Sequence, residues 1–104
     1  MSYPITLSQG WSRLASEIDA EIKRARAKFP EPGLLTTALT EEHGEAIRAV
    51  LEHYYLMRRG GSGTPGDLKR ARDEVRKELI QTAAMCVRLA LEGDPVHLLT
   101  SEAE

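Results

Sequence analysis

Hydrophobic residues recur every three or four positions along three long segments of this 104-residue chain. This spacing places them on one face of an α-helix, so each segment is predicted to be helical and amphipathic. The apolar stripes comprise Trp11, Leu14, Ile18, Ile22, Ala25 and Phe29; then Leu35, Leu39, Ala46, Ala49, Val50, His53 and Met57; and finally Leu68, Ala71, Val75, Leu79, Thr82, Cys86 and Leu89. No stretch alternates between apolar and polar residues in the way that predicts a β-strand. The expected fold class is all-α.

Two stretches rich in proline and glycine separate these segments, FPEPG at residues 29–33 and GGSGTPG at residues 60–66. Both residue types interrupt helices, so the two stretches are predicted to be connections. Ser8 is a candidate N-cap for the first helix, and Asp67 is one for the third. The sequence EGDP at residues 92–95 is expected to end the third helix, and the tail is expected to form one short turn.

The length of the chain corresponds to one domain, predicted over residues 1–104 with an ordered core at about 8–95. Three long amphipathic helices followed by a short C-terminal turn indicate a helical bundle. A domain of this size buries only a modest share of its surface. We therefore expect oligomerisation, as a homodimer or a homotetramer, to complete the bundle.

The charge and the single cysteine narrow the functional classes. A net charge of −2 is too small to indicate binding to a nucleic-acid polymer or to an anionic membrane. No apolar run is long enough to span a bilayer, and the N-terminal sequence MSYPITLSQGW lacks the basic start and apolar core of a signal peptide. Cys86 cannot form an intramolecular disulfide and is expected to be a reduced thiol packed as a small hydrophobe. These features favour a cytoplasmic protein.

Three glutamates, Glu41, Glu42 and Glu45, crowd about one turn of the second predicted helix, in LTEEHGEAIRAVLEHYY. Like charges at this spacing destabilise a helix by roughly 0.2–0.5 kcal/mol per pair. One interpretation makes Thr40 the N-cap, so that the first two glutamates meet the positive end of the helix dipole. The other begins the helix near Leu34, because the apolar residues before Thr40 share the phase of those downstream. Glu42 then projects into the apolar stripe, where an ionised carboxylate is costly unless it is paired or bound to a metal.

A matching set of polar residues borders the apolar stripe of the third predicted helix. Glu74, Glu78 and Gln81 follow one another at i, i+4 and i+7, positions that share one face of a helix. Taken alone, this edge is typical of a solvated helix flank. If the two stripes pack together, however, Glu42 and Glu45 come close to Glu78. Three or four oxygen ligands from two facing helices suit a hard divalent cation, so we expect a site for Mg²⁺, or for Mn²⁺, that neutralises the crowded carboxylates.

The sequence EEHGE at residues 41–45 resembles the EExxE motif of the MazG-like, all-α nucleoside triphosphate pyrophosphohydrolases. ELIQ at residues 78–81, followed by the apolar TAAMCVRLA, resembles the ExxD motif that this superfamily carries on its next helix. The resemblance extends over roughly residues 10–92. It implies a Mg²⁺-dependent enzyme that cleaves a nucleoside triphosphate to the monophosphate and pyrophosphate. It also implies the roles of individual residues: a metal site formed by Glu42, Glu45, Glu78 and Gln81, with Glu41 supporting the site, binding a second metal or helping to activate water.

Gln81 departs from this resemblance, because it stands where the second motif has an aspartate. Its carbonyl oxygen can still bind Mg²⁺, but a neutral amide brings no charge and cannot act as a base, which weakens the affinity for a cation. Glu74, one turn earlier, is a candidate for compensation. Two alternatives therefore stand beside the enzyme. One is a catalytically weakened MazG-like fold that binds nucleotides or proteins, and the other is a helical dimerisation domain with surface glutamates.

Other signals in the sequence favour ordinary structural roles. The glycine spacing of GGSGTPGDLK at residues 60–69 is similar to that of a P-loop, but Asp67 and Leu68 stand where Lys-Ser/Thr is required. His43 and His53 do not form an HExxH motif, and His53 is expected to be a hydrogen-bonded core histidine. Basic residues that would help to bind phosphates are Arg58, Arg59, Arg76, Lys77 and those of KRARAK at residues 23–28. The sequence does not single out any one of them.

Overall fold

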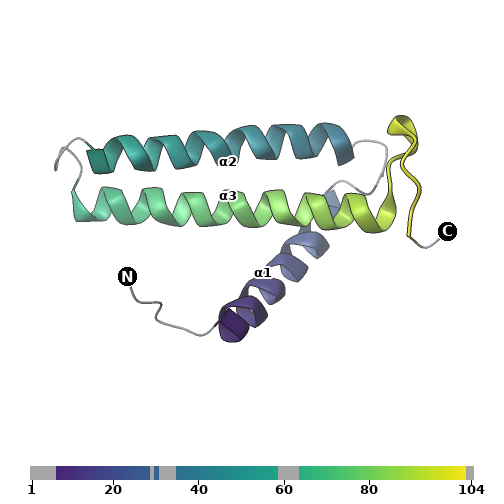
Figure 1. The fold of residues 1–104 in the computed structure, drawn as a ribbon, viewed down its shortest axis with the longest axis horizontal. Coiled ribbons are helices and arrows are strands. Elements are labelled where there is room, and N and C mark those ends of the chain that lie inside the picture. Colours follow the sequence, from purple (N-terminus) through teal and green to yellow (C-terminus); the bar gives the residue numbers. More distant parts are fainter. Residues whose placement is uncertain (1–6, 29, 31–34, 59–63, 103–104) are drawn as a thin grey trace.

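The computed structural model describes residues 7–28, 30, 35–58 and 64–102. Its elements are α1 (Leu7–Lys28), α2 (Leu35–Arg58), α3 (Pro65–Glu92) and the short 3₁₀ helix η2 (Pro95–His97). Helices α2 and α3 lie side by side and antiparallel, whereas α1 crosses α3 obliquely and diverges from the pair toward its own N-terminus (Figure 1). The described residues contain no β-strand, only an isolated bridge between Asp94 and Leu99. The prediction of an all-α fold with three long helices is confirmed. No helix in these ranges combines the length and the apolarity needed to cross a membrane.

The buried core consists mainly of alanines and a few larger side chains. Ala25 of α1, Leu35 of α2 and Met85 of α3 form a cluster that joins the three helices. The other buried apolar positions of the α2–α3 pair are small: Ala46, Ala49 and Ala84. The distance between packed helices depends on the side chains at their contact. Alanines at this contact therefore let α2 and α3 approach closely, which brings the polar residues beside them within reach of one another.

The start of α3 differs from the prediction. The Thr64 hydroxyl accepts a hydrogen bond from the Asp67 N–H at 3.1 Å, and the Asp67 carboxylate accepts one from the Thr64 N–H at 3.0 Å. This reciprocal pair is a capping box. The N-cap predicted at Asp67 is therefore wrong, because Thr64 is the N-cap and Asp67 lies three residues into the helix. Pro65 and Gly66, predicted to belong to the connection, form part of the first turn, where proline is favoured because it has no N–H to leave unpaired.

The start of α1 also differs from the prediction, whereas the end of α3 agrees with it. Helix α1 begins at Leu7, so Ser8 lies inside the helix and its predicted N-cap role is wrong. Helix α3 ends at Glu92, as the EGDP sequence predicts, and Gly93 follows with φ = 73°. A Cβ at Gly93 would lie 2.6 Å from the Leu99 carbonyl oxygen. Glycine is therefore needed for this sharp reversal of the chain, which leads into the predicted short turn.

The reversal after α3 places Asp94 against the start of α2. Its buried carboxylate accepts hydrogen bonds from the N–H groups of Thr36 at 3.1 Å and Val96 at 3.0 Å, and it lies 3.0 Å from His97 Nδ1. The pKa of Asp94 is lowered to about 2, first by the Thr36 side chain and then by the Thr36 N–H, His97 and Val96, against the opposing influence of burial. A residue at the end of α3 thus caps the first turn of α2, 58 residues away in sequence.

Several residues predicted for the core are exposed in the single chain. Trp11 is 62% exposed, because the N-terminal part of α1 lies away from the α2–α3 pair (Figure 1). Val50, Met57 and Leu79 are exposed, and Cys86 lies at the surface instead of packing as a small hydrophobe. The apolar stripes of α2 and α3 are wider than the face that one neighbouring helix covers. His53, predicted to be a core histidine, is half-buried. Phe29, Leu34 and Arg59, which the sequence analysis also singled out, lie outside the described residues.

Candidate metal centre

Helix α2 begins at Leu35, so the glutamates of EEHGE lie in its second and third turns. Thr40 is inside the helix, where its hydroxyl donates a hydrogen bond to the Thr36 carbonyl at 3.1 Å. An N-cap has a non-helical backbone and stands at the boundary of its helix. The interpretation that made Thr40 the N-cap is therefore wrong, and the glutamates do not owe their place to the helix dipole.

Three carboxylates converge between α2 and α3. One oxygen from each of Glu42, Glu45 and Glu78 lies within 4.8 Å of the other two. Glu78 is only 6% exposed, Glu42 is half-buried, and Glu45 faces the surface. The helices are joined at this level by Thr82, whose hydroxyl lies 2.8 Å from the Glu78 carbonyl oxygen and 3.2 Å from the Glu42 carbonyl oxygen. The two stripes therefore pack so that the glutamates meet, as expected for helices that share a polar site.

The electrostatics of this group are unfavourable in the absence of a cation. Glu42, Glu45 and Glu78 take part in none of the ion pairs found among the described residues. Burial and neighbouring carboxylates, Glu74 first among them, raise the pKa of Glu78 to about 7. Burial also raises the pKa of Glu42, and the charges of Glu45 and Glu21 add to this effect. Repulsion is thus concentrated at a point where a bound cation would relieve it.

Gln81 lies three residues after Glu78 and reaches the same carboxylates. With its amide oxygen and nitrogen exchanged, the nitrogen lies 3.1 Å from Glu78 Oε2 and 3.2 Å from Glu42 Oε2. This orientation gives two hydrogen bonds to acceptors and is favoured when no ion is bound. The Gln81 amide can therefore donate to both carboxylates when no ion is bound. After a half-turn about the Cγ–Cδ bond, its oxygen can instead bind an ion.

Glu41 and Glu74 flank the three-carboxylate group. Glu41 is exposed and lies on the outer side of Glu42, as its helical phase predicts. Glu74 is exposed, and its carboxylate lies 3.9 Å from Lys77 Nζ. The interpretation of this edge of α3 as a solvated flank is therefore wrong for Glu78, which is 6% exposed. Glu74 is exposed but still interacts with Glu78 and helps to raise its pKa.

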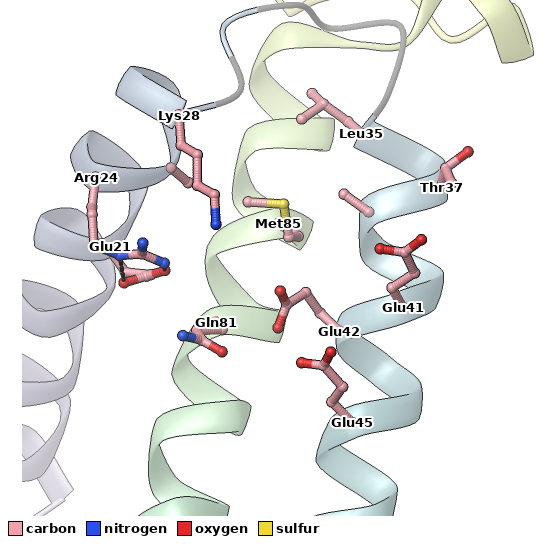
Figure 2. A pocket seen from close by; sticks show the side chains of 12 residues that line it. Glu21, Arg24, Lys28, Leu35, Thr37, Glu41, Glu42, Glu45, Gln81 and Met85 are labelled. Carbon is pink, nitrogen blue, oxygen red and sulfur yellow. Dashed lines mark hydrogen bonds and ion pairs between the residues drawn. The ribbon is translucent and has the colours of Figure 1, made fainter.

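A pocket of about 370 Å³ opens beside the carboxylates and is lined by all three helices (Figure 2). Glu41, Glu42, Glu45 and Gln81 form one part of its lining. The rest of the lining combines apolar side chains with two basic residues and one acidic residue of α1 and a threonine of α2: Ala25, Leu35, Ala38, Met85, Arg24, Lys28, Glu21 and Thr37. An apolar wall with a few convergent polar groups is typical of a small-molecule site.

The basic residues at the pocket were not distinguished by the sequence. Arg76, a candidate for phosphate binding, pairs with Glu17 of α1 at 2.5 Å. Arg24 and Lys28 line the pocket instead, and the other basic residues of KRARAK do not. Their position depends on the angle at which α1 crosses α3, a quantity that has no signature in the sequence of α1 itself.

The donor atoms fit a hard divalent cation. The three carboxylates and the Gln81 amide provide oxygen ligands from two helices, the donor type that Mg²⁺ and Mn²⁺ prefer. No histidine or cysteine joins this group within the described ranges, so the site is unlike those that select zinc. Comparison with family models, with curated proteins and with solved structures finds no match for the chain.

Proposed function

We propose that the protein is a Mg²⁺-dependent nucleoside triphosphate pyrophosphohydrolase of the MazG-like kind, which forms a nucleoside monophosphate and pyrophosphate. The observation that carries this proposal is the meeting of Glu42, Glu45 and Glu78 within 4.8 Å on two facing helices. The order of the EExxE-like and ExxD-like sequences supports it. The adjoining pocket supports it further, because a ligand seated there would reach the carboxylates directly.

In this proposal each residue of the site has a distinct role. Glu42, Glu45 and Glu78 hold the ion, and Gln81 adds an amide oxygen. When bound, Mg²⁺ lowers the pKa of a coordinated water and neutralises phosphate charge. Glu41, exposed beside the group, accepts a proton from the attacking water. The apolar wall of the pocket excludes bulk water from the remainder of the ligand, which strengthens electrostatic interactions at the reacting phosphate.

A nucleotide-binding or protein-interaction module is the second candidate, and Gln81 is the residue that favours it. Its amide nitrogen is able to satisfy Glu42 and Glu78 without an ion, and it brings one negative charge fewer than an aspartate. Such a protein would keep the pocket and bind ions weakly, with little or no turnover. A dimerisation domain with surface glutamates is less compatible with Glu78, which is only 6% exposed.

An activity panel separates these candidates. Incubation with Mg²⁺ and nucleoside triphosphates of each base, in ribose and deoxyribose forms, is expected to release pyrophosphate, and EDTA is expected to stop the release. Calorimetric titration with Mn²⁺ alone is expected to show binding for the enzyme and for the weakened module, but not for the dimerisation domain. Mn²⁺ binding without release of pyrophosphate from any nucleotide would contradict the enzyme and support the module.

The outer face of α2 supports a further part of the proposal, that the protein is a homodimer or homotetramer. Tyr54 and Tyr55 are exposed and meet edge to face, with 5.8 Å between their ring centroids. Contiguous exposed apolar surface marks interaction sites, and a second copy of an antiparallel helix pair would bury this face in a four-helix arrangement. The exposed apolar and aromatic residues of the face are Ile47, Val50, Leu51, Tyr54, Tyr55 and Met57.

Replacing Ile47 and Tyr54 together by aspartate is expected to convert the oligomer into a monomer. Both side chains lie on this face, and burial of an unpaired carboxylate against a partner is strongly unfavourable. We expect self-association to weaken by at least about 100-fold. Size-exclusion chromatography with light scattering measures the mass, and the double variant Val96→Asp and Leu98→Asp, which adds the same two charges at exposed apolar residues after α3, is the matched control. A double variant of Ile47 and Tyr54 that keeps the mass of the unaltered oligomer would contradict the assignment of this face.

Gln81→Asp is expected to increase the affinity for Mn²⁺ by about 10-fold, because cation affinity rises with the number of charged ligands. The same change is expected to lower the free energy of unfolding in the absence of metal, since a fourth carboxylate adds repulsion. Calorimetry measures the first effect, and urea unfolding measures the second. Gln81→Asn is the matched control, because asparagine has the length of aspartate without its charge. Equal Mn²⁺ affinities of the two variants would argue against a ligand at position 81.

A further inference from the structure

The basic residues that line the pocket, Arg24 and Lys28, both come from α1. They are one helical turn apart, and they lie across the pocket from Glu41, Glu42 and Glu45 of α2 (Figure 2). The α1 wall of the pocket thus carries two cations and the carboxylate of Glu21, whereas the charged residues of the α2 wall are all carboxylates. A ligand that carries both a bound divalent cation and several negative charges matches this arrangement, because its cation faces α2 while its anionic groups face α1.

Glu21 holds the Arg24 side chain in place. Arg24 Nε donates a hydrogen bond to Glu21 Oε2 at 2.9 Å, and Arg24 Nη2 donates a second one to Glu21 Oε1. The Glu21 side chain is 15% exposed and that of Arg24 is 56% exposed, so the carboxylate is the inner anchor and the guanidinium stays accessible. A guanidinium carries five N–H donors. Glu21 accepts from the Nε–Nη2 edge of the guanidinium, and the N–H groups of the Nη1–Nη2 edge face away from Glu21 and can donate to a ligand in the pocket.

Arg24 lies near the carboxylate group without pairing with it. Arg24 and Glu42 line the same pocket. Arg24 forms its ion pair with Glu21 and none with Glu42. This cation therefore lies near the proposed ion but is held by another residue, so a phosphate between the ion and Arg24 would be attracted from both sides.

We propose that Arg24, oriented by Glu21, binds the pyrophosphate portion of the nucleotide and stabilises it as the leaving group. The inference rests on the proposed function. In the reaction, a water oxygen forms a bond to the phosphorus next to the nucleoside, and the bond between that phosphorus and the oxygen of pyrophosphate breaks. The electron pair of the broken bond stays on pyrophosphate, where negative charge develops. A guanidinium fork matches two phosphate oxygens at once, which the single ammonium of Lys28 does not.

Arg24→Gln tests this role. We expect kcat/KM to fall about 10- to 100-fold for the nucleotide that the unaltered protein hydrolyses fastest, since one charge-assisted contact to phosphate is lost. Inhibition by added pyrophosphate should weaken by a similar factor, whereas inhibition by the nucleoside monophosphate and the affinity for Mn²⁺ without nucleotide should not change. Arg24→Lys keeps the charge without the fork and should recover part of the loss. Arg13→Gln is the matched control, because Arg13 is exposed on the same helix and does not line the pocket.

The outcomes distinguish this inference from the proposed function. Equal inhibition by pyrophosphate in Arg24→Gln and Arg13→Gln, with an active unaltered protein, would overturn the role of Arg24 and leave the enzyme standing. An equal loss of Mn²⁺ affinity and of pyrophosphate inhibition in Arg24→Gln would also overturn it, because the change would then act on the whole site. An unaltered protein that hydrolyses no nucleotide would overturn both.

Discussion

Replacement of Glu42, Glu45 or Glu78 by glutamine is expected to lower kcat/KM for nucleoside triphosphate hydrolysis by at least about 100-fold. Each change keeps the shape of the side chain and removes one of the three charges proposed to hold Mg²⁺. Loss of residues that only support metal ligands already reduces affinity or activity by about 10- to 100-fold, so loss of a ligand should have a larger effect. Release of pyrophosphate at a series of Mg²⁺ concentrations measures the change.

The three variants should differ in how far added Mg²⁺ restores activity. Glu45 faces the surface, where water replaces a lost ligand readily, so high Mg²⁺ should rescue Glu45→Gln more than Glu78→Gln. Glu102→Gln is the control, since Glu102 is exposed in the C-terminal segment, away from the pocket lining. A Glu78→Gln protein with the kcat/KM of Glu102→Gln would rule out the proposed metal centre.

Glu41→Gln separates proton transfer from metal binding within this experiment. If Glu41 accepts a proton from water, its loss should reduce kcat by about 100-fold, within the range for general bases, while Mn²⁺ affinity stays close to that of the unaltered protein. A loss of Mn²⁺ affinity as large as that of Glu42→Gln would make Glu41 a metal ligand instead.

In the absence of divalent ions, the free energy of unfolding is expected to decrease as the pH rises from about 5 to about 8. Folding raises the pKa of Glu78 from 4.5 to about 7, so between these values the folded protein holds a proton that the unfolded chain has released. The stabilisation by that proton is complete below pH 4.5 and is lost as the pH rises through 7. At about 1.4 kcal/mol per pKa unit, the expected loss is on the order of 3 kcal/mol. Glu42, whose pKa is also raised, acts in the same direction.

Urea unfolding at several pH values, with EDTA present, measures this dependence. Glu78→Gln should remove most of it and should be more stable than the unaltered protein at pH 8, because a neutral amide replaces a buried and crowded carboxylate. Saturating Mn²⁺ should reverse the slope for the unaltered protein, since the ion binds deprotonated carboxylates and stabilises the folded state that binds it. A Glu78→Gln protein that is less stable than the unaltered one at pH 8 would contradict the proposed repulsion.

These predictions share one physical origin. Glu78 is 6% exposed and lies beside Glu42 and Glu45. Its charge is expected to destabilise the folded protein without a bound ion and to contribute to the binding of one. Gln81 moderates the conflict, because its amide can donate to Glu42 and Glu78 when no ion is present. Functional residues often lower the stability of the folded protein, because the arrangement that a site requires is unfavourable for folding.

The sequence alone was sufficient to predict the three helices and the all-α class. Helical periodicity and the breaks at residues 29–33 and 60–66 are properties of each segment by itself. The inward direction of Glu42 followed from the apolar residues that precede it, once the helix was taken to start near Leu34. Predicting that Glu42 lies near Glu78 required one further assumption, that the two apolar stripes pack against each other.

The predicted helix caps were less accurate. Ser8, Thr64 and Asp67 are all residue types that suit the start of a helix, and the sequence alone does not show which of them is the N-cap.

Other features were decided only by the tertiary structure. Trp11 and Cys86 belong to apolar stripes yet lie at the surface, because periodicity marks a face without showing whether another helix covers it. Asp94 caps the first turn of α2 from the far end of the chain, and Arg24 rather than Arg76 lines the pocket. Each of these contacts depends on crossing angles and on the path of the chain between helices. Such quantities arise from the packing of distant segments, so the local pattern of residues along any one helix does not contain them.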